Sequence, residues 1–483
     1  MSISTPHAAR RRSTRAMAAL SVAALCLTSF TLSVTLAAPS GAHVAAGGGH
    51  GGGNGGGGHG NGGGGHGGGG GGHGTDLGRQ VLAADDGWAS AGSGTTGGSA
   101  ADAAHVFRVS TWPELQAALG GAGARGDTTP RIVYVEGALH AGDTADGARL
   151  TCADYEARSG FAMADYIAAF DPAVWGAADP SGPLEDARVA AAAVQAAQTQ
   201  QHIGSNVTII GVGKDASITG ANLRIRDSHN VIVRNLRVSD AYDCFPAWDP
   251  GDTNAGNWNS AYDNISVWTS TNVWVDHTTL DDGDNPPSSL PTVYGRPFEV
   301  HDGLLDITHG SDLVTVSYNR FDDHDKTMLI GSSDSRVQDR GLHRVTIHHN
   351  RWTDVGQRAP RVRYGQVHVY NNHYVQTTPG LFQYYWGVGV ESAIVAQNNA
   401  FTLARGVTAD RIIAPWKGTA ITETGSVVNR RPTNVLATFN AVNEPDLGAD
   451  AGWTPTHANR VEPTWSVART VDKEAGAGRI GKR

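Results

Sequence analysis

Four stretches in the second half of the chain share one pattern: 313–321 LVTVSYNRF, 344–352 RVTIHHNRW, 366–374 QVHVYNNHY and 393–401 AIVAQNNAF. Apolar and polar residues alternate in each, which is typical of a strand with one buried face. A branched apolar residue is followed five positions later by asparagine every time. The four pairs are Val314 with Asn319, Val345 with Asn350, Val367 with Asn372, and Ile394 with Asn399. Similar runs begin at 206, 230 and 272, so one strand-and-turn unit recurs at spacings of 22 to 42 residues.

Recurrence of one short unit predicts a solenoid, in which each strand stacks on the equivalent strand of the next turn. Asparagines at one place in successive units would either form a ladder of amide hydrogen bonds or supply left-handed corners between strands. A β-sandwich would also contain many short strands, but hairpin signals are few and the repeat stays in phase. We therefore predict an all-β fold, a single-stranded parallel β-helix with long loops and a few peripheral helices.

Two segments outside the repeats predict helices. Residues 110–114, STWPE, place proline in a first turn and resemble a helix start. Residues 183–201 are rich in alanine, and we expect Leu184, Val189 and Val194 to face the core of the protein.

Residues 1–42 have the features of an export signal peptide. A basic segment from Arg10 to Arg15 precedes a mostly apolar run at 18–38, and small residues follow. We expect cleavage near Ala38 or Ala42. The alternative is an uncleaved membrane anchor, because the run is nearly long enough to span a bilayer.

Residues 43–75 are almost all glycine with regularly spaced histidines. Glycine at this density cannot bury a core, so we expect a flexible linker, with metal binding by the histidines as the alternative. The protein is predicted to be secreted, monomeric and free of the membrane after cleavage.

Charge and cysteine content restrict the partners and the compartment. The net charge is −9, and loss of the four leader arginines makes it about −13, which argues against a nucleic-acid partner. A polyanion held by a local basic cluster remains compatible with this charge. Cys26 would leave with the signal peptide, so Cys152 and Cys244 either pair or stay separate buried thiols.

Three aspartates near the repeats form a candidate metal site. Asp302 and Asp306 open the stretch at 301–331, and Asp263 begins the strand run about one turn earlier. Converging carboxylates are costly without a cation, and calcium prefers such oxygen ligands. The alternative is that the three residues cap separate turns.

Three bases follow the aspartates: Lys326, Arg358 and Arg363. Guanidinium forks match carboxylates, and lysine offers a point charge. A polymer of uronic acid would satisfy both sets, since a cation and the arginines could share its carboxylates. The alternative is that these bases are surface ion-pair partners.

The long loops carry aromatic residues that suit sugar rings or local packing. They are Trp248, Trp258, Tyr262 and Tyr294. For any single one of them, local packing is the preferred interpretation.

The runs YDNIS, NVWVDH, HDGLLDI, VTVSYNRFDDHDK and QRAPRVRYGQVHVYNN resemble the pectate lyases of polysaccharide lyase family 1. The resemblance extends over residues 76–483. It implies a right-handed parallel β-helix catalytic domain that cleaves de-esterified polygalacturonate (pectate) by β-elimination with calcium and yields unsaturated oligogalacturonates.

The resemblance also implies roles for individual residues. It assigns calcium ligation to Asp263, Asp302 and Asp306, and the role of Brønsted base to Arg358. Substrate binding falls on two further bases, Lys326 and Arg363. Asp252 matches a position that holds an additional calcium arriving with substrate.

Two other functions are alternatives to this one. A pectin lyase acting on methyl-esterified pectin would depend little on calcium, and the three aspartates speak against it. A non-catalytic β-helix that binds polysaccharide would bind pectate without cleaving it.

Overall fold

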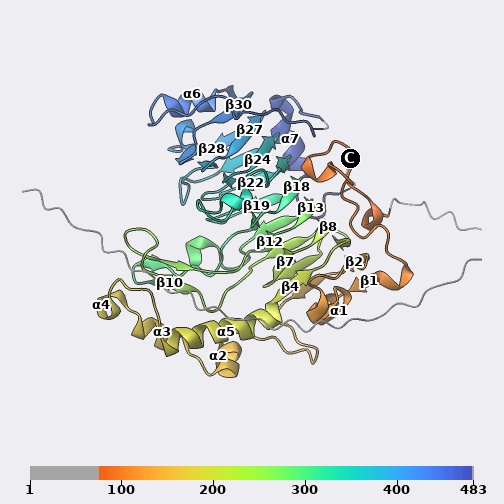
Figure 1. Cartoon of the computed structure of the whole chain (residues 1–483), viewed down its shortest axis with the longest axis vertical. Helices are drawn as coiled ribbons and strands as arrows, with labels where there is room; N and C mark the ends of the chain where they lie inside the picture. Colours follow the sequence, from red (N-terminus) through yellow and green to blue (C-terminus); the bar gives the residue numbers. More distant parts are fainter. Residues whose placement is uncertain (1–75, 459, 481–483) are drawn as a thin grey trace, which may run out of the picture. The chain divides into compact units, whose positions relative to one another are not determined.

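The computed structural model describes residues 76–458 and 460–480, so the predicted signal peptide and Gly/His linker lie outside the described residues. Three sheets of parallel strands make up most of the described chain (Figure 1). We name them the first, second and third sheets. The first sheet contains β1 (Val106–Val109), β2 (Arg131–Val135), β5 (Val207–Gly211), β8 (His229–Arg234), β13 (Thr271–Asp276), β18 (Asp312–Ser317), β21 (Val345–His348), β24 (Gln366–Tyr370), β27 (Ala393–Gln397) and β30 (Ile421–Thr424).

The second and third sheets contain most of the remaining strands. The second sheet contains β4 (Gln200–Ile203), β7 (Asn222–Arg226), β12 (Ile265–Trp268), β17 (Leu305–Thr308), β20 (Leu329–Ile330), β23 (Arg361–Val362), β26 (Trp386–Gly389) and β29 (Ile413–Trp416). The third sheet contains β3 (Ala138–His140), β6 (Ser217–Thr219), β9 (Arg237–Ser239), β14 (Thr279–Asp281), β19 (Arg320–Asp322), β22 (Arg351–Thr353), β25 (His373–Gln376), β28 (Ala400–Leu403), β31 (Val427–Val428) and the antiparallel β32 (Arg431–Pro432).

Helices and two small hairpins lie outside the three sheets. The hairpins are β10 (Ala247–Asp249) with β11 (Asn257–Asn259), and β15 (Thr292–Val293) with β16 (Arg296–Pro297). The helices are α1 (Trp112–Ala118), α2 (Cys152–Ser159), α3 (Met163–Ala169), α4 (Pro172–Trp175), α5 (Pro183–Thr199), α6 (Val435–Asn440) and α7 (Thr464–Glu474).

The chain visits the second, first and third sheets in turn, and each coil stacks on the one before. The coil β12, β13, β14 pairs strand by strand with the coil β17, β18, β19. From β4 to β31, the connection between successive strands of one sheet is therefore a full turn of the coil. This arrangement confirms the predicted parallel β-helix and excludes the β-sandwich.

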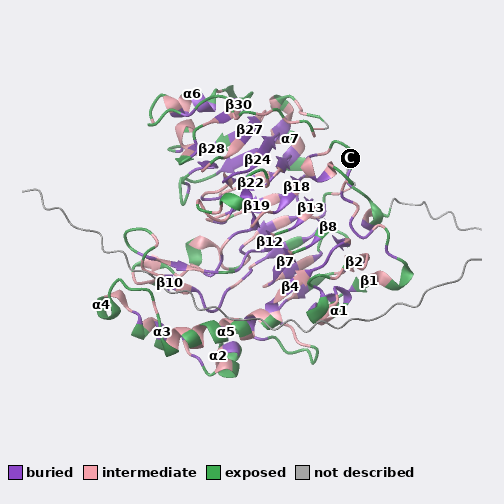
Figure 2. Ribbon diagram, viewed as in Figure 1, coloured by how far each residue is buried: buried purple, intermediate pink, exposed green. Residues whose placement is uncertain are grey.

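The sequence repeat corresponds directly to the register of the first sheet. Val314 lies opposite Val345, which lies opposite Val367, which lies opposite Ile394. All four side chains are fully buried, because alternate strand residues point into the coil interior. Figure 2 shows the same burial along the stacked strands.

The four repeated asparagines form the predicted ladder. The side-chain oxygen of Asn350 accepts from the Asn319 backbone amide at 2.8 Å and from the Asn319 side-chain amide at 3.0 Å. Asn372 accepts in the same way from Asn350, and Asn399 from Asn372. Each side-chain amide also donates to a backbone carbonyl on the first-sheet strand of the preceding coil, so these buried polar groups are satisfied.

The left-handed backbone falls one residue before the ladder. Tyr318, His349, Asn371 and Asn398 have φ between 50° and 55°. The repeated asparagine therefore serves the hydrogen-bonded ladder, and the alternative in which it forms the left-handed corner is wrong.

An aromatic stack follows the ladder and was not anticipated from the sequence. The ring centroids of Phe321 and Trp352 lie 4.1 Å apart, those of Trp352 and Tyr374 5.8 Å, and those of Tyr374 and Phe401 4.8 Å. These residues end the four quoted stretches, so the signal was present two positions after each asparagine. Stacked rings in the interior add buried apolar area to every coil.

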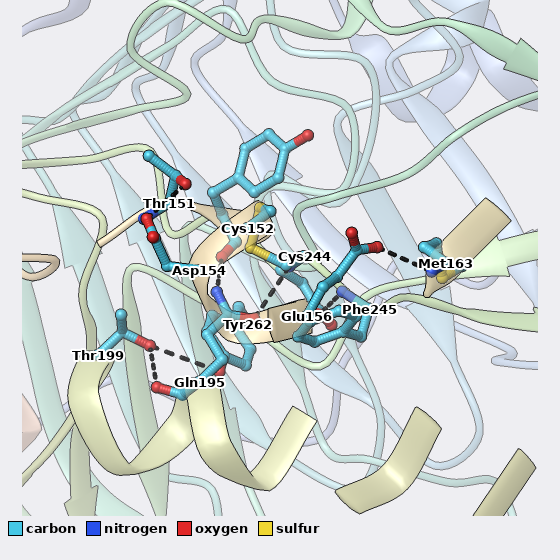
Figure 3. The surroundings of a disulfide bond; sticks show 12 residues. Thr151, Cys152, Asp154, Glu156, Met163, Gln195, Thr199, Cys244, Phe245 and Tyr262 are labelled. Atoms are coloured by element: carbon cyan, nitrogen blue, oxygen red, sulfur yellow. Dashed lines mark hydrogen bonds between the residues drawn. A yellow bond between two sulfur atoms is a disulfide. The ribbon is translucent and has the colours of Figure 1, made fainter. Parts of the chain in front are cut away.

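A second apolar core lies between helices α2, α3 and α5 and the loops that follow β9 and β14. Cys152 at the start of α2 and Cys244 in the loop after β9 form a disulfide across 92 residues (Figure 3). One of the two open alternatives for these cysteines is thereby confirmed. The disulfide attaches the helical segment to the loop that leads into β12.

Both predicted helices are present, and Leu184 and Val194 of α5 pack against the second core as expected, whereas Val189 does not. The start of α1 has a capping box between Thr111 and Glu114, as the sequence suggests. In α5 the buried residues are Ala191, Gln195 and Thr199, whereas Val189 is 53% exposed. Gln195 is buried because it donates to the Tyr242 carbonyl and accepts from the Cys244 amide.

None of the helices in the described part of the chain is long and apolar enough to cross a membrane.

Candidate active site

The predicted functional residues gather where the chain enters the second sheet. Asp263 lies two residues before β12, and Asp302 three residues before β17. Lys326 and Arg358 lie three residues before β20 and β23. Because these strands are neighbours in the sheet, residues spread over about a hundred positions of sequence meet at one edge.

The three aspartates converge. One carboxylate oxygen from each of Asp263, Asp302 and Asp306 lies within 4.8 Å of the other two. Asp306 is the first outward-facing residue of β17 and pairs in register with Ser266 of β12. Among the residues that the structure describes, this is the one group of three or more metal-ligand side chains that meets this distance.

Few groups neutralise the charge of these carboxylates. Burial raises the pKa of Asp263 to about 7, and the Asp302 charge contributes to the rise. Burial also raises the pKa of Asp306, followed by the charges of Asp263 and Asp302, while Arg358 acts in the opposite direction. Buried carboxylates that resist ionisation together are stabilised by a cation between them. The donor set therefore fits a hard divalent cation.

Backbone and hydroxyl donors fix the orientation of the carboxylates. Gly303 donates its amide to Asp263 at 2.9 Å, and Ser266 donates its hydroxyl to the other Asp263 oxygen at 2.6 Å. Leu329 donates its amide to Asp306 at 2.8 Å. A Cβ atom at Gly303 would lie 2.5 Å from an Asp306 oxygen and 2.9 Å from an Asp263 oxygen. Only glycine leaves room for the carboxylates at this position.

A buried histidine holds the Asp302 loop from behind. His324 donates from Nε2 to the Asp302 carbonyl at 3.0 Å and from Nδ1 to the Asp282 carboxylate at 2.8 Å. Burial opposes charge on His324, but the Asp282 carboxylate outweighs it and raises the pKa of His324 to about 9. The imidazolium therefore keeps both of its donors at neutral pH.

Three arginines lie on or next to β23, which is two strands from β17 in the second sheet. Arg358 is close enough to Asp306 to stabilise its charge, and it has φ of 58°. Its buried Nε atom has no hydrogen-bond partner among the described residues. Burial lowers the pKa of Arg361 to about 10, and the charges of Arg363 and Arg358 contribute. The three guanidinium groups therefore interact electrostatically.

Carboxylates hold two of the predicted bases in place. The Arg363 Nε donates to Asp334 at 2.6 Å, and its Nη1 donates to the Gly331 carbonyl at 2.9 Å. The Lys326 Nζ lies 3.6 Å from a carboxylate oxygen of Glu299. Both bases thus take part in ion pairs, which agrees with the alternative interpretation of these residues. They also lie at the same edge of the sheet as the aspartates.

Other predicted residues take no part in this cluster. Trp248 and Trp258 are at most 4% exposed and pack in the second core, and Tyr262 is buried, so local packing is confirmed for these three residues. Asp252 lies between β10 and β11, where its carboxylate accepts from Asn257 at 3.0 Å. It does not belong to the group of three aspartates.

Sequence reasoning missed the residues that support the site. Gly303 stands inside the quoted HDGLLDI motif, and its place beside an aspartate was the available signal. Ser266 lies three residues after Asp263, within the same YDNIS motif. No sequence pattern links Glu299 to Lys326, because loops of unequal length bring them together.

Comparison with known proteins places this geometry in one family. A family profile described as pectate lyase matches residues 173–454. A pectate lyase of Bacillus subtilis (strain 168) is 41% identical over 409 residues, which cover 84% of this chain and 94% of that protein.

Solved structures agree with the sequence relatives. The thermostable pectate lyase PL 47 superposes with a TM-score of 0.82 at 43% identity, over 84% of this chain and 100% of that chain. A pectate lyase bound to a hexasaccharide superposes with a TM-score of 0.79 at 40% identity, with the same coverage. Profile, sequence and structure coincide over most of both chains, and the protein belongs to the pectate lyase family.

Proposed function

We propose that this enzyme is a secreted, calcium-dependent lyase that cleaves de-esterified polygalacturonate by β-elimination. The observation that carries the proposal is the convergence of three aspartates at β12 and β17 on the same sheet as a group of arginines at β23, two strands from β17. The family supplies the lyase activity, and a relative of similar structure is described as bound to a hexasaccharide.

Calcium suits the aspartate site because it takes carboxylate oxygens together with carbonyl and water ligands. Asp263, Asp302 and Asp306 would hold it, with Gly303 leaving room between them. Bound there, calcium would withdraw electron density from a galacturonate carboxylate and acidify the proton on the adjacent ring carbon.

Arg358 is proposed to remove that proton. The electron pair of the broken carbon–hydrogen bond forms the new ring double bond, and the oxygen at the 4-position leaves with the neighbouring sugar. The departing oxygen takes up a proton, and no water is consumed. A guanidinium can accept a proton only after losing one, and nearby positive charge favours that loss. The lowered pKa of Arg361 supports such an environment.

Lys326 and Arg363 are proposed to bind the substrate carboxylates and to stabilise the negative charge that develops on them. Asp334 holds the Arg363 guanidinium in a fixed orientation, which reduces the entropy lost when a carboxylate binds. Glu299 provides a similar anchor for Lys326.

Secretion is proposed on two grounds. The predicted signal peptide directs export, and the disulfide between Cys152 and Cys244 is characteristic of an oxidising compartment. The substrate is an extracellular polymer too large to enter a cell intact.

The test compares two substrates with two readouts. Purified protein is incubated with polygalacturonate and, separately, with highly methyl-esterified pectin, while near-ultraviolet absorbance and reducing ends are followed. We expect absorbance to rise on polygalacturonate and much less on the ester. A preference for the ester would identify a pectin lyase, and reducing ends without absorbance would indicate hydrolysis. Both results would overturn the proposal.

A further inference from the structure

The second sheet carries a basic surface on the far side of the aspartates from Arg358. Arg224 and Arg226 of β7 both point outward, since the intervening Ile225 is fully buried. Arg224 lies in register with Ser266, which lies in register with Asp306. Arg224 is thus two strands from the aspartate site on the same face of the sheet.

These arginines carry more positive charge than their neighbours balance. Arg224 donates to the neutral Gln200 side chain at 2.6 Å, and in the described part of the chain it has no carboxylate within ion-pair distance. Burial lowers the pKa of Arg224, and the Arg226 charge lowers it further, while Asp263 opposes the change. Arg226 reaches only Asp227, at 3.8 Å, and Asp227 is already bound by Arg125.

A stack of planar groups fixes the Arg226 guanidinium. Its carbon lies 4.3 Å from the ring centroid of Trp268, and Trp268 stacks on His309 at 3.7 Å. The stack follows the register across β7, β12 and the end of β17, one plane on each strand. The buried Nε atom of Arg226 has no hydrogen-bond partner among the described residues. The Arg226 guanidinium is therefore held in place while part of its hydrogen-bonding capacity is unused, as expected for a group that binds an anion.

The same face continues past the aspartates to the arginines of β23. From β7 to β23 there are four strand steps, or about 19 Å at ~4.8 Å per step. A polyanion lying across the strands would therefore contact Arg361 and Arg363 at one end and Arg224 and Arg226 at the other. The aspartate site would lie between the two basic groups.

We propose that Arg224 and Arg226 form a distal subsite that binds carboxylates of the same polyuronate chain beyond the reaction centre, with Trp268 and His309 positioning Arg226. This inference rests on the proposed function for its ligand. A subsite at this distance selects long chains, because a short oligomer at the reaction centre does not reach β7. The subsite strengthens binding and leaves the chemical step unchanged.

The experiment compares chain lengths in the full-length protein. Arg224→Gln and Arg226→Gln are combined, and KM and kcat are measured on long polygalacturonate and on trigalacturonate. We expect KM for the long polymer to rise about tenfold, the effect of losing a charged hydrogen bond. We expect an unchanged kcat and an unchanged KM for the trimer. Arg108→Gln on β1, which removes an exposed ion pair with Glu136, is the matched control.

Arg226→Lys tests the stacked geometry, because lysine keeps the charge and loses the planar fork. We expect the affinity of this variant for the long polymer to lie between those of the wild type and the double variant. An equal rise of KM on both substrates would mean that the arginines merely neutralise Asp263, and no change on either would mean that the polymer lies elsewhere. Both results overturn the subsite.

A binding measurement separates this inference from the proposed function. Retardation of the protein in a gel that contains polygalacturonate reports binding without catalysis. If the wild type shows no lyase activity but is retarded, and the double variant is not retarded, the result would support the subsite and overturn the lyase activity. If the wild type is active and the double variant has the same retardation and the same kinetics, the result would overturn the subsite alone.

Discussion

Two corners of the same β-helix, the asparagine ladder and the cluster of aspartates and bases, are built by the same stacking of coils but differ in their roles. Where the chain passes from the first sheet to the third, four successive coils repeat one asparagine, and their side-chain amides hydrogen-bond to one another. Where it enters the second sheet, successive coils present Asp263, Asp302, Lys326 and Arg358, and no residue type serves all four positions. The first corner is buried and electrically neutral, and the second gathers charges that an external ligand must balance. Strand spacing brings equivalent positions together in both, and the side chains decide whether the result is stability or chemistry.

The largest effect should come from removing the proposed base at the charged corner. Arg358→Ala should lower kcat on polygalacturonate by about 10³-fold or more, because general-base removal and lost charge stabilisation combine. Steady-state absorbance kinetics measure it, and circular dichroism should report an intact fold. Arg351→Ala, beside the asparagine ladder, is the matched control and should retain activity. Substantial activity in the Arg358 variant would remove the base assignment.

Breaking the neutral corner should give the reverse result. Asn350→Ala removes the acceptor of the Asn319 backbone amide and one of the two donors to the Asn372 side-chain oxygen, all in a fully buried site. We expect the free energy of unfolding to fall by about 3 kcal/mol, measured by denaturant titration. The kcat of the folded fraction should stay at the wild-type value. A variant with normal stability would show that the ladder contributes nothing net.

A smaller change should weaken the metal site without altering its ligands. Gly303→Ala places a Cβ against the Asp306 and Asp263 oxygens, so the carboxylates must move. We expect calcium affinity, measured by calorimetry, to fall about 10- to 100-fold, the range typical of second-shell changes. Gly123→Ala is the control, since its Cβ would meet open space. Equal calcium affinity in both variants would place the cation elsewhere.

The mildest perturbation is a change of pH. Without metal, Asp263 has its pKa raised to about 7 by burial and by Asp302, with Ser266, Gly303 and His324 facing it. A raised carboxyl pKa means that the proton stays bound below that pH, so calcium must displace it. Calcium affinity should therefore fall by up to about tenfold per pH unit below 7 and level off above it. The metal-free protein should lose stability as the pH rises from about 4 to 7, because Asp263 ionises in the unfolded chain over this range while the folded protein keeps its proton. Calorimetry across this range tests both statements, and a pH-independent affinity would contradict them.

The contrast between the corners explains what could be predicted from the sequence. Val314, Val345, Val367 and Ile394 align in the sequence because each faces the same interior column, so periodicity alone predicts the coil and the ladder. The charged corner has no internal repeat, and its residues were assigned by resemblance to a family. Calcium remained one of two interpretations when only the spacing of the aspartates was considered.

What could not be predicted depends on loops of unequal length and on packing partners. Glu299 meets Lys326, and Asp334 meets Arg363, through connections whose paths the sequence does not encode locally. On α5, Leu184 and Val194 pack as expected, but the burial of Gln195 was missed for a related reason. Gln195 is buried because the loop at Tyr242 and Cys244 offers it hydrogen bonds, and hydrophobic periodicity cannot reveal such a partner.

The most direct test of the account is a calcium cycle on polygalacturonate. Near-ultraviolet absorbance is followed with calcium, then with excess chelator, and then after calcium is restored. The account predicts a rise that stops on chelation and resumes on restoration, because the nearby positive groups, Arg358 and His324, do not balance the charge of the three aspartates. A rise indifferent to the chelator would keep the elimination but contradict the role given to Asp263, Asp302 and Asp306.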